Sequence, residues 1–137
     1  MKYFLDTNII IYAVKGKFPA IPEHFARVPA ASIVVPAMVL AEIEYGARKS
    51  RDYNKTIGRY LPFLEPFEVV PFSDAAARSY GEIRSRLEKG GKTIGANNLV
   101  IAATVLSEGG ILITHNTKEF ARIPGLNLED WTKPLDN

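Results

Sequence analysis

Three short runs of the sequence are apolar at every position, and they alternate with longer segments that have helical periodicity. The runs are Tyr3–Leu5, Ile33–Val35 and Ile111–Ile113, and segments 68–72 and 126–128 are also strand-like. Continuous apolar runs of this length are typical of strands buried on both faces, as in parallel sheets. The alternation therefore predicts a three-layer α/β/α fold with a mainly parallel sheet of about five strands.

Start and stop signals indicate where the helices lie between these strands. Asp6-Thr7-Asn8 are residues favoured at helix starts, Pro36 suits a first helical turn, and Ser73 is a good cap. Gly90-Gly91 is a typical helix end. We expect helices over residues 9–14, 36–49, 51–64, 73–87 and 99–106, and a short helical turn at 118–120.

Length and composition restrict the kind of protein. The 137 residues fit one domain, 1–137. The absence of cysteine excludes a disulfide framework, a thiolate zinc site and a cysteine nucleophile, and His24 and His115 lack the spacing of a histidine-based metalloprotease. No apolar run reaches about 18 residues and no signal-peptide pattern is present, so we expect a cytoplasmic protein without membrane contact.

Polar residues follow two of the predicted strands directly. They are Asp6, Thr7 and Asn8 after the first strand, and Thr114, His115 and Asn116 after 111–113. Ligands of parallel α/β sheets bind outside the carboxyl ends of the strands, so these positions are candidates for a site. Asp6 could equally be a helix cap, although Thr7 or Asn8 could fill that role.

Other acidic and amide side chains have a structural and a functional interpretation. Glu42 and Glu44 flank the apolar face of the 36–49 helix on opposite sides, and the pattern does not choose between them. Glu119 lies in a first helical turn, where a carboxylate is favoured by the helix dipole alone. Asn97 and Asn98 both precede a very apolar helix, and only one of them is needed as a cap.

Carboxylates that converge from strand ends and helix starts repel one another and need a cation to ionise together. Oxygen ligands suit Mg²⁺ or Mn²⁺, and such ions activate water for phosphodiester hydrolysis. The pattern thus predicts an acidic metal site.

Four motifs, in order and covering nearly the whole chain, resemble those of PIN-domain ribonucleases of the VapC type, which are toxins of bacterial toxin–antitoxin pairs. The first is Phe4–Ile9 with Tyr12 and Lys15-Gly16, and the second is Glu42-Ile43-x-Tyr45-Gly46-Ala47 with Lys49-Ser50. The third is Ile94–Ala103, and the fourth is Thr114-x-Asn116-Thr117-x-Glu119-Phe120, followed by Arg122–Leu126 and Trp131.

The resemblance implies an acidic site of Asp6, Glu42, position 98 and Glu119, in which Asp6, Glu119 and position 98 bind the metal. It favours Glu42 over Glu44. Neutral groups would support the site: Thr7, Asn8, Thr114 and Asn116. It also implies a Mg²⁺- or Mn²⁺-dependent endoribonuclease, a homodimer, and a VapB-type antitoxin that blocks the site. Relatives of this type suggest a structured RNA such as tRNA as substrate.

The sequence departs from the family pattern at Asn98, where an Asp is expected. The amide has lost one negative charge, and its NH₂ donates where a carboxylate only accepts. We interpret Asn98 as an inactivating residue. An engineered change explains it better than a natural variant, because an intact toxin would harm the cell that expresses it.

Basic residues near these motifs are candidates for RNA phosphate contacts, although solvated helix surface is the simpler interpretation of each. They are Lys15, Arg48, Lys49 and Arg51. Tyr12 and Tyr45 could stack on unpaired bases, or simply pack. Two other functions stay open: a non-catalytic PIN-fold module that sequesters RNA or antitoxin, and a metal-dependent phosphatase or DNA nuclease.

Overall fold

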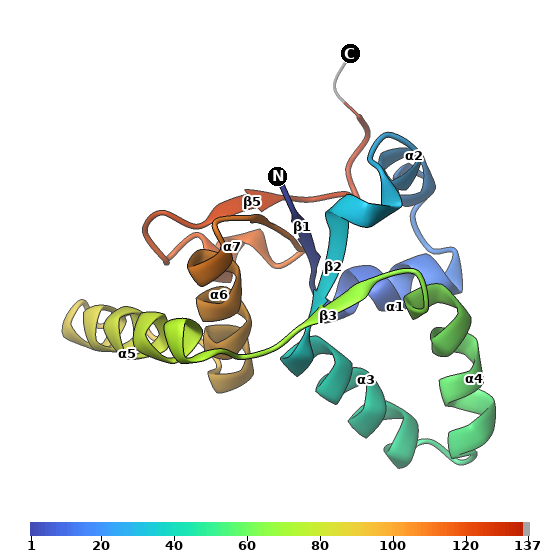
Figure 1. The fold of residues 1–137 in the computed structure, drawn as a ribbon, viewed down its shortest axis with the longest axis horizontal. Coiled ribbons are helices and arrows are strands. Elements are labelled where there is room, and N and C mark those ends of the chain that lie inside the picture. Colours follow the sequence, from blue (N-terminus) through green and yellow to red (C-terminus); the bar gives the residue numbers. More distant parts are fainter. Residues whose placement is uncertain (136–137) are drawn as a thin grey trace.

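The computed structural model describes residues 1–135, and at its centre lies a five-stranded sheet in which every strand pairing is parallel (Figure 1). The strand order is β3-β2-β1-β4-β5. The strands are β1 Tyr3–Leu5, β2 Ile33–Pro36, β3 Glu68–Val70, β4 Ile111–Ile113 and β5 Asn127–Glu129. The predicted fold class is confirmed. The single domain expected over 1–137 stays a prediction, and its last two residues lie outside the described part.

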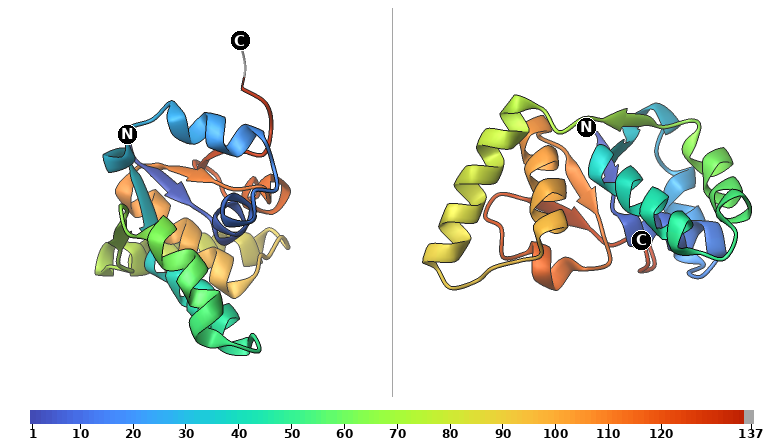
Figure 2. Two further views of the ribbon diagram at one scale, coloured as in Figure 1. Left: turned by 90° about the vertical axis from the view of Figure 1, so that its right-hand side faces the viewer. Right: turned by 90° about the horizontal axis from the view of Figure 1, so that it is seen from below.

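Helices cover both faces of the sheet, as the two views of Figure 2 show. They are α1 Thr7–Lys15, α2 Ala20–Ala26, α3 Ala37–Lys49, α4 Tyr53–Leu64, α5 Asp74–Lys89, α6 Ala96–Glu108 and α7 Thr117–Phe120, with a 3₁₀ turn at Ala30–Ser32. Helices α5 and α6 pack side by side at one end of the molecule, and α3 and α4 form a projecting pair at the other (Figure 1).

Strand β1 lies in the middle of the sheet and sets the position of everything that follows it. Phe4 is in register with Val34 of β2 and with Leu112 of β4, and Leu5 is opposite Ile113. The strands therefore end together, and the next residues, Asp6 and Thr114, emerge side by side. This is the edge of the sheet at which the sequence predicts a site.

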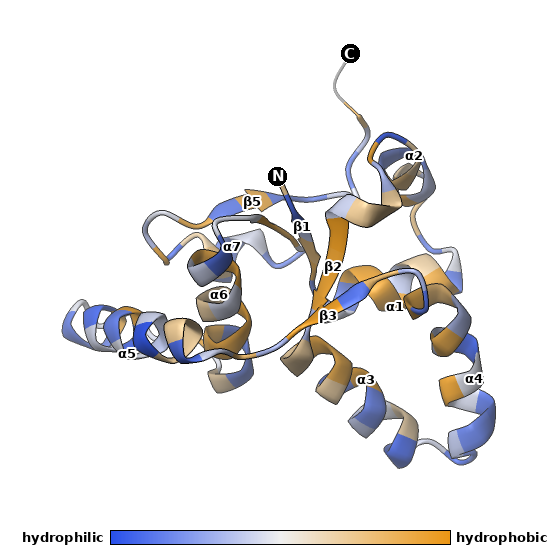
Figure 3. Cartoon of the chain, viewed as in Figure 1, coloured by the Kyte–Doolittle hydropathy of each residue, from blue (hydrophilic) through white to orange (hydrophobic). Residues whose placement is uncertain are grey.

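The apolar runs form the core. The central strand residues are almost completely buried, and α6 contributes Ile101, Ala102 and Ala103 without measurable exposure. Figure 3 shows the same pattern, with hydrophobic colour on β2 and α6 and mainly hydrophilic colour on α5. The very apolar α6 is thus an interior helix, and α5 shields one of its sides from solvent.

No helix was expected between residues 14 and 33, yet α2 forms there. Pro22 lies in the first turn of α2, where a proline removes no helical hydrogen bond. Phe25 of α2 packs against Phe63, Phe67 and Trp131, with ring centroids 5.7, 6.4 and 5.0 Å apart. The side chains of Phe63 near the end of α4 and Phe67 just after it are therefore partly covered by α2.

We expect Gly110→Ala to destabilise the fold by about 1–3 kcal/mol, because an added methyl group would overpack the interior. A Cβ there would lie 2.7 Å from Phe4 Cδ1 and 2.8 Å from the carbonyl oxygen of Lys2. The control is Gly81→Ala in the exposed middle of α5, where a Cβ meets nothing within 4 Å. It should raise stability by about 0.5–1 kcal/mol. Denaturant unfolding of both variants is the measurement, and equal effects would contradict the overpacking.

Candidate functional site

Asp6 joins β1 to α1 and has two hydrogen-bonding roles at once. Its Oδ1 accepts from the backbone N–H of Thr7 at 2.8 Å and caps α1, and its Oδ2 accepts from Thr114 Oγ1 at 2.7 Å. The residue is only 5% exposed. Burial raises its pKa, the charges of Glu42 and Glu119 add to the increase, and the bonds from Thr114 and Thr7 oppose it. The cap and site interpretations are therefore compatible.

Glu42 reaches the same edge of the sheet from α3. Thr7 Oγ1 donates to its Oε1 at 2.7 Å, and Asn97 Nδ2 lies 3.5 Å from its Oε2. Glu44, the alternative on this helix, turns the other way and accepts from the Tyr53 hydroxyl at 2.8 Å. Glu44 thus fastens α3 to α4, while Glu42 lies beside the residues that follow β1.

Glu119 reaches the edge from α7. Its Oε1 accepts from the backbone N–H of Gly95 at 2.9 Å and its Oε2 from Asn116 Nδ2 at 2.8 Å. These two bonds lower the pKa of Glu119 against a smaller opposing effect of burial, and the Asn98 amide adds to the lowering. Glu119 is therefore favoured in its charged form.

Asn98 lies in the first turn of α6, which begins earlier than expected. Gly95 is the N-cap residue of α6, and no side chain caps the helix. The expectation that one of the two asparagines is the cap is thus wrong. A Cβ at Gly95 would lie 3.8 Å from Glu119 Oε1 and 3.9 Å from Asn98 Nδ2, so both groups flank this glycine.

Three of the four expected neutral residues contact the carboxylates. Thr7 binds Glu42, Thr114 binds Asp6, and Asn116 binds Glu119. Thr114 Oγ1 also accepts from the backbone N–H of Asn116 at 3.0 Å, which connects the surroundings of Asp6 to those of Glu119. Asn8 is exposed and makes no hydrogen bond to a candidate residue within 1–135.

Two contributors escaped the sequence analysis. The backbone N–H of Gly95 holds Glu119, and the Asn97 amide lies at hydrogen-bond range from Glu42. Asn97 was considered only as a possible helix cap. A backbone donor has no side-chain signal, although a glycine just before a helix start was the available hint.

The expected RNA-binding residues are all exposed, and none forms an ion pair within residues 1–135. Lys15 ends α1, and Arg51 lies between α3 and α4. The Arg48 guanidinium stacks 3.7 Å from the Tyr53 ring centroid, and Lys49 Nζ is 5.4 Å from that of Tyr45. Tyr45 is 65% exposed.

The three carboxylates of this site have only neutral hydrogen-bond donors. Exposed acids elsewhere, such as Asp74 and Glu88, pair with arginines, but within residues 1–135 no lysine or arginine pairs with Asp6, Glu42 or Glu119. Arg122 is near enough to help lower the pKa of Glu119, but it forms no ion pair with it. A cluster of carboxylates without an ion-paired cation is a suitable environment for a metal ion.

The donor set fits Mg²⁺ or Mn²⁺, which favour oxygen ligands. Within the described chain no three acidic or histidine side chains approach closely enough to enclose an ion. Mg²⁺ is usually bound by only one or two carboxylates and keeps several waters. Asp6 and Glu119, with the Asn98 carbonyl oxygen and water, match that kind of coordination.

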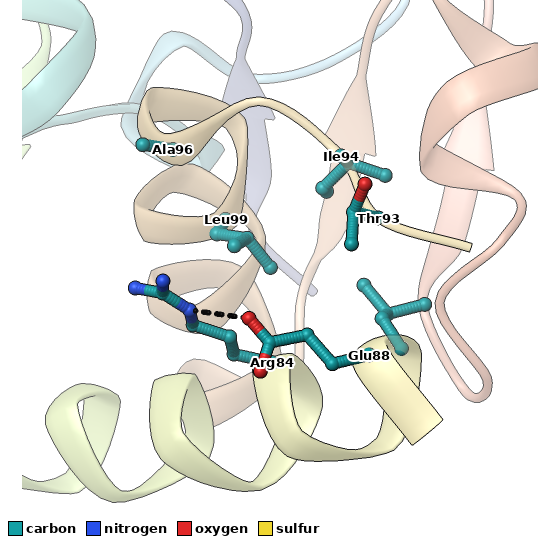
Figure 4. Close-up of a pocket in the computed structure, with 7 residues that line it drawn as sticks. Arg84, Glu88, Thr93, Ile94, Ala96 and Leu99 are labelled. Atoms are coloured by element: carbon teal, nitrogen blue, oxygen red, sulfur yellow. Dashed lines mark hydrogen bonds and ion pairs between the residues drawn. The ribbon is translucent and has the colours of Figure 1, made fainter. Parts of the chain in front are cut away.

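A separate cavity of about 180 Å³ lies between α5 and α6 (Figure 4). Its lining combines the apolar side chains of Leu87 and Leu99 with the Arg84–Glu88 ion pair, and none of the candidate site residues lines it. The cavity is thus next to the start of α6 but is not part of the acidic site.

Comparison with known proteins gives consistent similarities. The PIN domain family model matches residues 3–126. Ribonuclease VapC2 of Rickettsia felis is 40% identical over 135 residues, which cover 97% of this chain and 100% of the relative. The tRNA(fMet)-specific endonuclease VapC of Shigella flexneri is 34% identical, with coverage of 96% and 99%. The crystal structure of VapBC2 from R. felis bound to a promoter DNA fragment superimposes with a TM-score of 0.89 at 37% identity, covering 96% and 99% of the two chains.

The opposite pKa shifts of Asp6 and Glu119 predict opposite effects on the pH dependence of stability without metal. A group whose pKa is higher in the folded than in the unfolded chain stabilises the fold at low pH, and this stability is lost as pH rises through the folded-state pKa. A group whose folded-state pKa is lower stabilises the fold at higher pH, and this stability is lost as pH falls through the folded-state pKa. Asp6→Asn should therefore gain stability relative to the unchanged chain as pH rises above about 4, the unfolded pKa of an aspartate.

Glu119→Gln is the matched comparison. Its stability relative to the unchanged chain should fall as pH rises from the acid range to the unfolded pKa of a glutamate, about 4.3, and then stay lower. Unfolding would be measured in the presence of a chelator. Changes of the same sign in the two variants would contradict the assigned shifts.

Proposed function

This chain belongs to the PIN-domain family of VapC-type ribonucleases, and on that premise we propose that it is the endoribonuclease toxin of a type II toxin–antitoxin system that requires Mg²⁺ or Mn²⁺. The observation that supports this function best is the group of Asp6, Glu42 and Glu119 at one edge of the sheet, held by neutral hydrogen-bond donors and, within residues 1–135, without an ion pair to a lysine or arginine. Such a site can bind a divalent ion, and the bound ion could in turn bind a phosphate of RNA. We further propose that the protein acts in the cytoplasm. Within residues 1–135, no helix is long and apolar enough to cross a membrane.

In this proposal Asp6, Asn98 and Glu119 hold the ion. When bound, the ion offsets the negative charge of the phosphate and lowers the pKa of a water. Thr114 and the Thr7 N–H fix Asp6, and Asn116 and the Gly95 N–H fix Glu119, so that both carboxylates keep their positions when substrate arrives.

Glu42 has a different role in the proposed reaction. Its Oε1 is held by Thr7, whereas its Oε2 has only the long 3.5 Å contact with Asn97. Oε2 is therefore the oxygen best able to accept a proton from the attacking water. The exposed basic residues Lys15, Arg48, Lys49 and Arg51 would contact phosphates along the RNA.

The substrate class follows from the relatives. The S. flexneri relative is named as a tRNA(fMet)-specific endonuclease, which supports a structured RNA such as tRNA as the substrate of this chain. The R. felis structure contains VapBC2, which supports a VapB-type antitoxin as partner. The homodimer stays a prediction.

Asn98 favours a second function, a PIN-fold module that binds RNA or antitoxin without cleaving. An amide at this position gives the site three formal negative charges where the family pattern gives four, and it helps to lower the pKa of Glu119. We propose that this impairs both metal binding and cleavage.

We expect Asn98→Asp to raise RNA cleavage by at least on the order of 100-fold, because a displaced ligand disturbs the geometry of the attacking water. Cleavage should need Mg²⁺ or Mn²⁺, stop in chelator, and arrest growth on expression. Without metal the variant should unfold more easily than the unchanged chain, since a fourth carboxylate adds repulsion. Cleavage assays and chelator unfolding are the measurements. Equal activity of the two forms on cellular RNA would favour the binding module.

We also expect the antitoxin to bring an Arg or Lys of its C-terminal segment to Asp6 and Glu119, in the charge-assisted pairing that favours carboxylates. Asp6→Ala combined with Glu119→Ala should therefore weaken antitoxin binding, as measured by titration calorimetry. The control is Asp74→Ala combined with Glu82→Ala, which removes two exposed acids of α5. Unchanged affinity in the first double variant would exclude this inhibition mechanism.

A further inference from the structure

Three aromatic rings gather beside the acidic site at the carboxyl edge of the sheet. Tyr12 of α1, Phe18 of the following loop and His115 after β4 form the aromatic cluster, with ring centroids 5.0, 6.0 and 5.8 Å apart. His115 is adjacent in sequence to Thr114, which binds Asp6. Tyr12 lies five residues after Thr7, or about 7–8 Å along the helix axis. The aromatic cluster therefore lies close to the candidate reaction centre.

The His115 ring is exposed but fixed in orientation. Its Nδ1 lies 3.1 Å from Asp130 Oδ2 and 3.1 Å from Thr132 Oγ1. The Thr132 hydroxyl donates to Asp130 Oδ1 at 2.6 Å, so both groups that face Nδ1 are acceptors and Nδ1 carries the proton. The His115 side chain is 46% exposed although that of Asp130 is only 7% exposed. A buried acid thus holds an exposed ring in place.

A positive charge lies on the cluster. Lys17 Nζ is 5.1 Å from the ring centroid of Tyr12 and 5.9 Å from that of Phe18. Lys17 is exposed and forms no ion pair within residues 1–135. An aromatic surface with an adjacent cation matches an unpaired nucleobase and its phosphate, because bases stack on aromatic rings and lysine attracts the backbone.

We propose that the aromatic cluster and Lys17 form a nucleotide subsite, in which an unpaired RNA base near the cleaved phosphodiester stacks on the exposed ring of His115. Asp130 and Thr132 are positioning residues that hold the ring. This subsite rests on the proposed ribonuclease function and adds to it the place where single-stranded RNA enters the site. It gives affinity for an unpaired base with little preference for its identity, because every base has a face that can stack.

The test is the affinity of the full chain for a fluorescently labelled single-stranded oligoribonucleotide, measured by anisotropy in chelator so that no cleavage intervenes. His115→Ala should weaken binding about 5- to 150-fold, the range for loss of one base–aromatic stack. His115→Phe keeps a ring and should retain most of the affinity. Replacing a single base by an abasic site should weaken binding to the unchanged chain and have little further effect on His115→Ala.

Lys17→Ala tests the cationic part. It should reduce the slope of log affinity against log salt by about 0.7, the value for one phosphate contact on a single strand. Lys89→Ala is the control, since this lysine ends α5 at the far end of the molecule from α1 (Figure 1). It should leave both affinity and slope unchanged.

Unchanged RNA affinity in His115→Ala would overturn the subsite, as would an effect on antitoxin binding alone. Absence of RNA binding by the unchanged chain would also overturn it, because no residue of the cluster is a metal ligand. None of these results decides the ribonuclease function itself, which depends separately on cleavage by Asn98→Asp. The two proposals can therefore fail independently.

Discussion

The site depends on one buried hydrogen bond, from Thr114 Oγ1 to Asp6 Oδ2 at 2.7 Å. It joins the residues that follow the two neighbouring central strands, and both partners are almost completely shielded from water. Leaving either one unsatisfied there would cost about 1–3 kcal/mol. The same hydroxyl accepts from the Asn116 backbone and so orients the segment that leads to Glu119. A hydroxyl, which both donates and accepts, can make these two connections at once.

The neutrality of the donors is a compromise between folding and function. An arginine paired with the Asp6 carboxylate would neutralise the charge of Asp6 and lower its pKa, but the guanidinium would also occupy the space of the ion. Threonine, asparagine and backbone N–H groups orient the oxygens without removing the negative potential. As a consequence, the charged form of Asp6 is disfavoured, because burial and two neighbouring carboxylates raise its pKa. The fold accepts this repulsion, and a bound cation would relieve it.

Sequence patterns predicted the features that depend on residues close together in the chain. The apolar runs gave the strands because a strand buried on both faces has no polar position, and Asp6 was identifiable because it follows such a run directly. Helix α2 was missed because the tolerance of a helix for Pro22 depends on where the helix begins. Periodicity alone could not distinguish Glu42 from Glu44, because their roles depend on the direction of each side chain. It also could not predict the contact of Gly95 with Glu119, because these residues are far apart in sequence.

The strand order has a consequence for synthesis on the ribosome. Strand β1 is made before the other four strands, yet one of its two neighbours is β4, more than 100 residues later. Pairings between such distant segments form late, after the intervening chain is available. The proposed acidic site combines residues 6, 42, 98 and 119. It could therefore assemble only after α7, which carries Glu119, has been made and β4 has paired with β1.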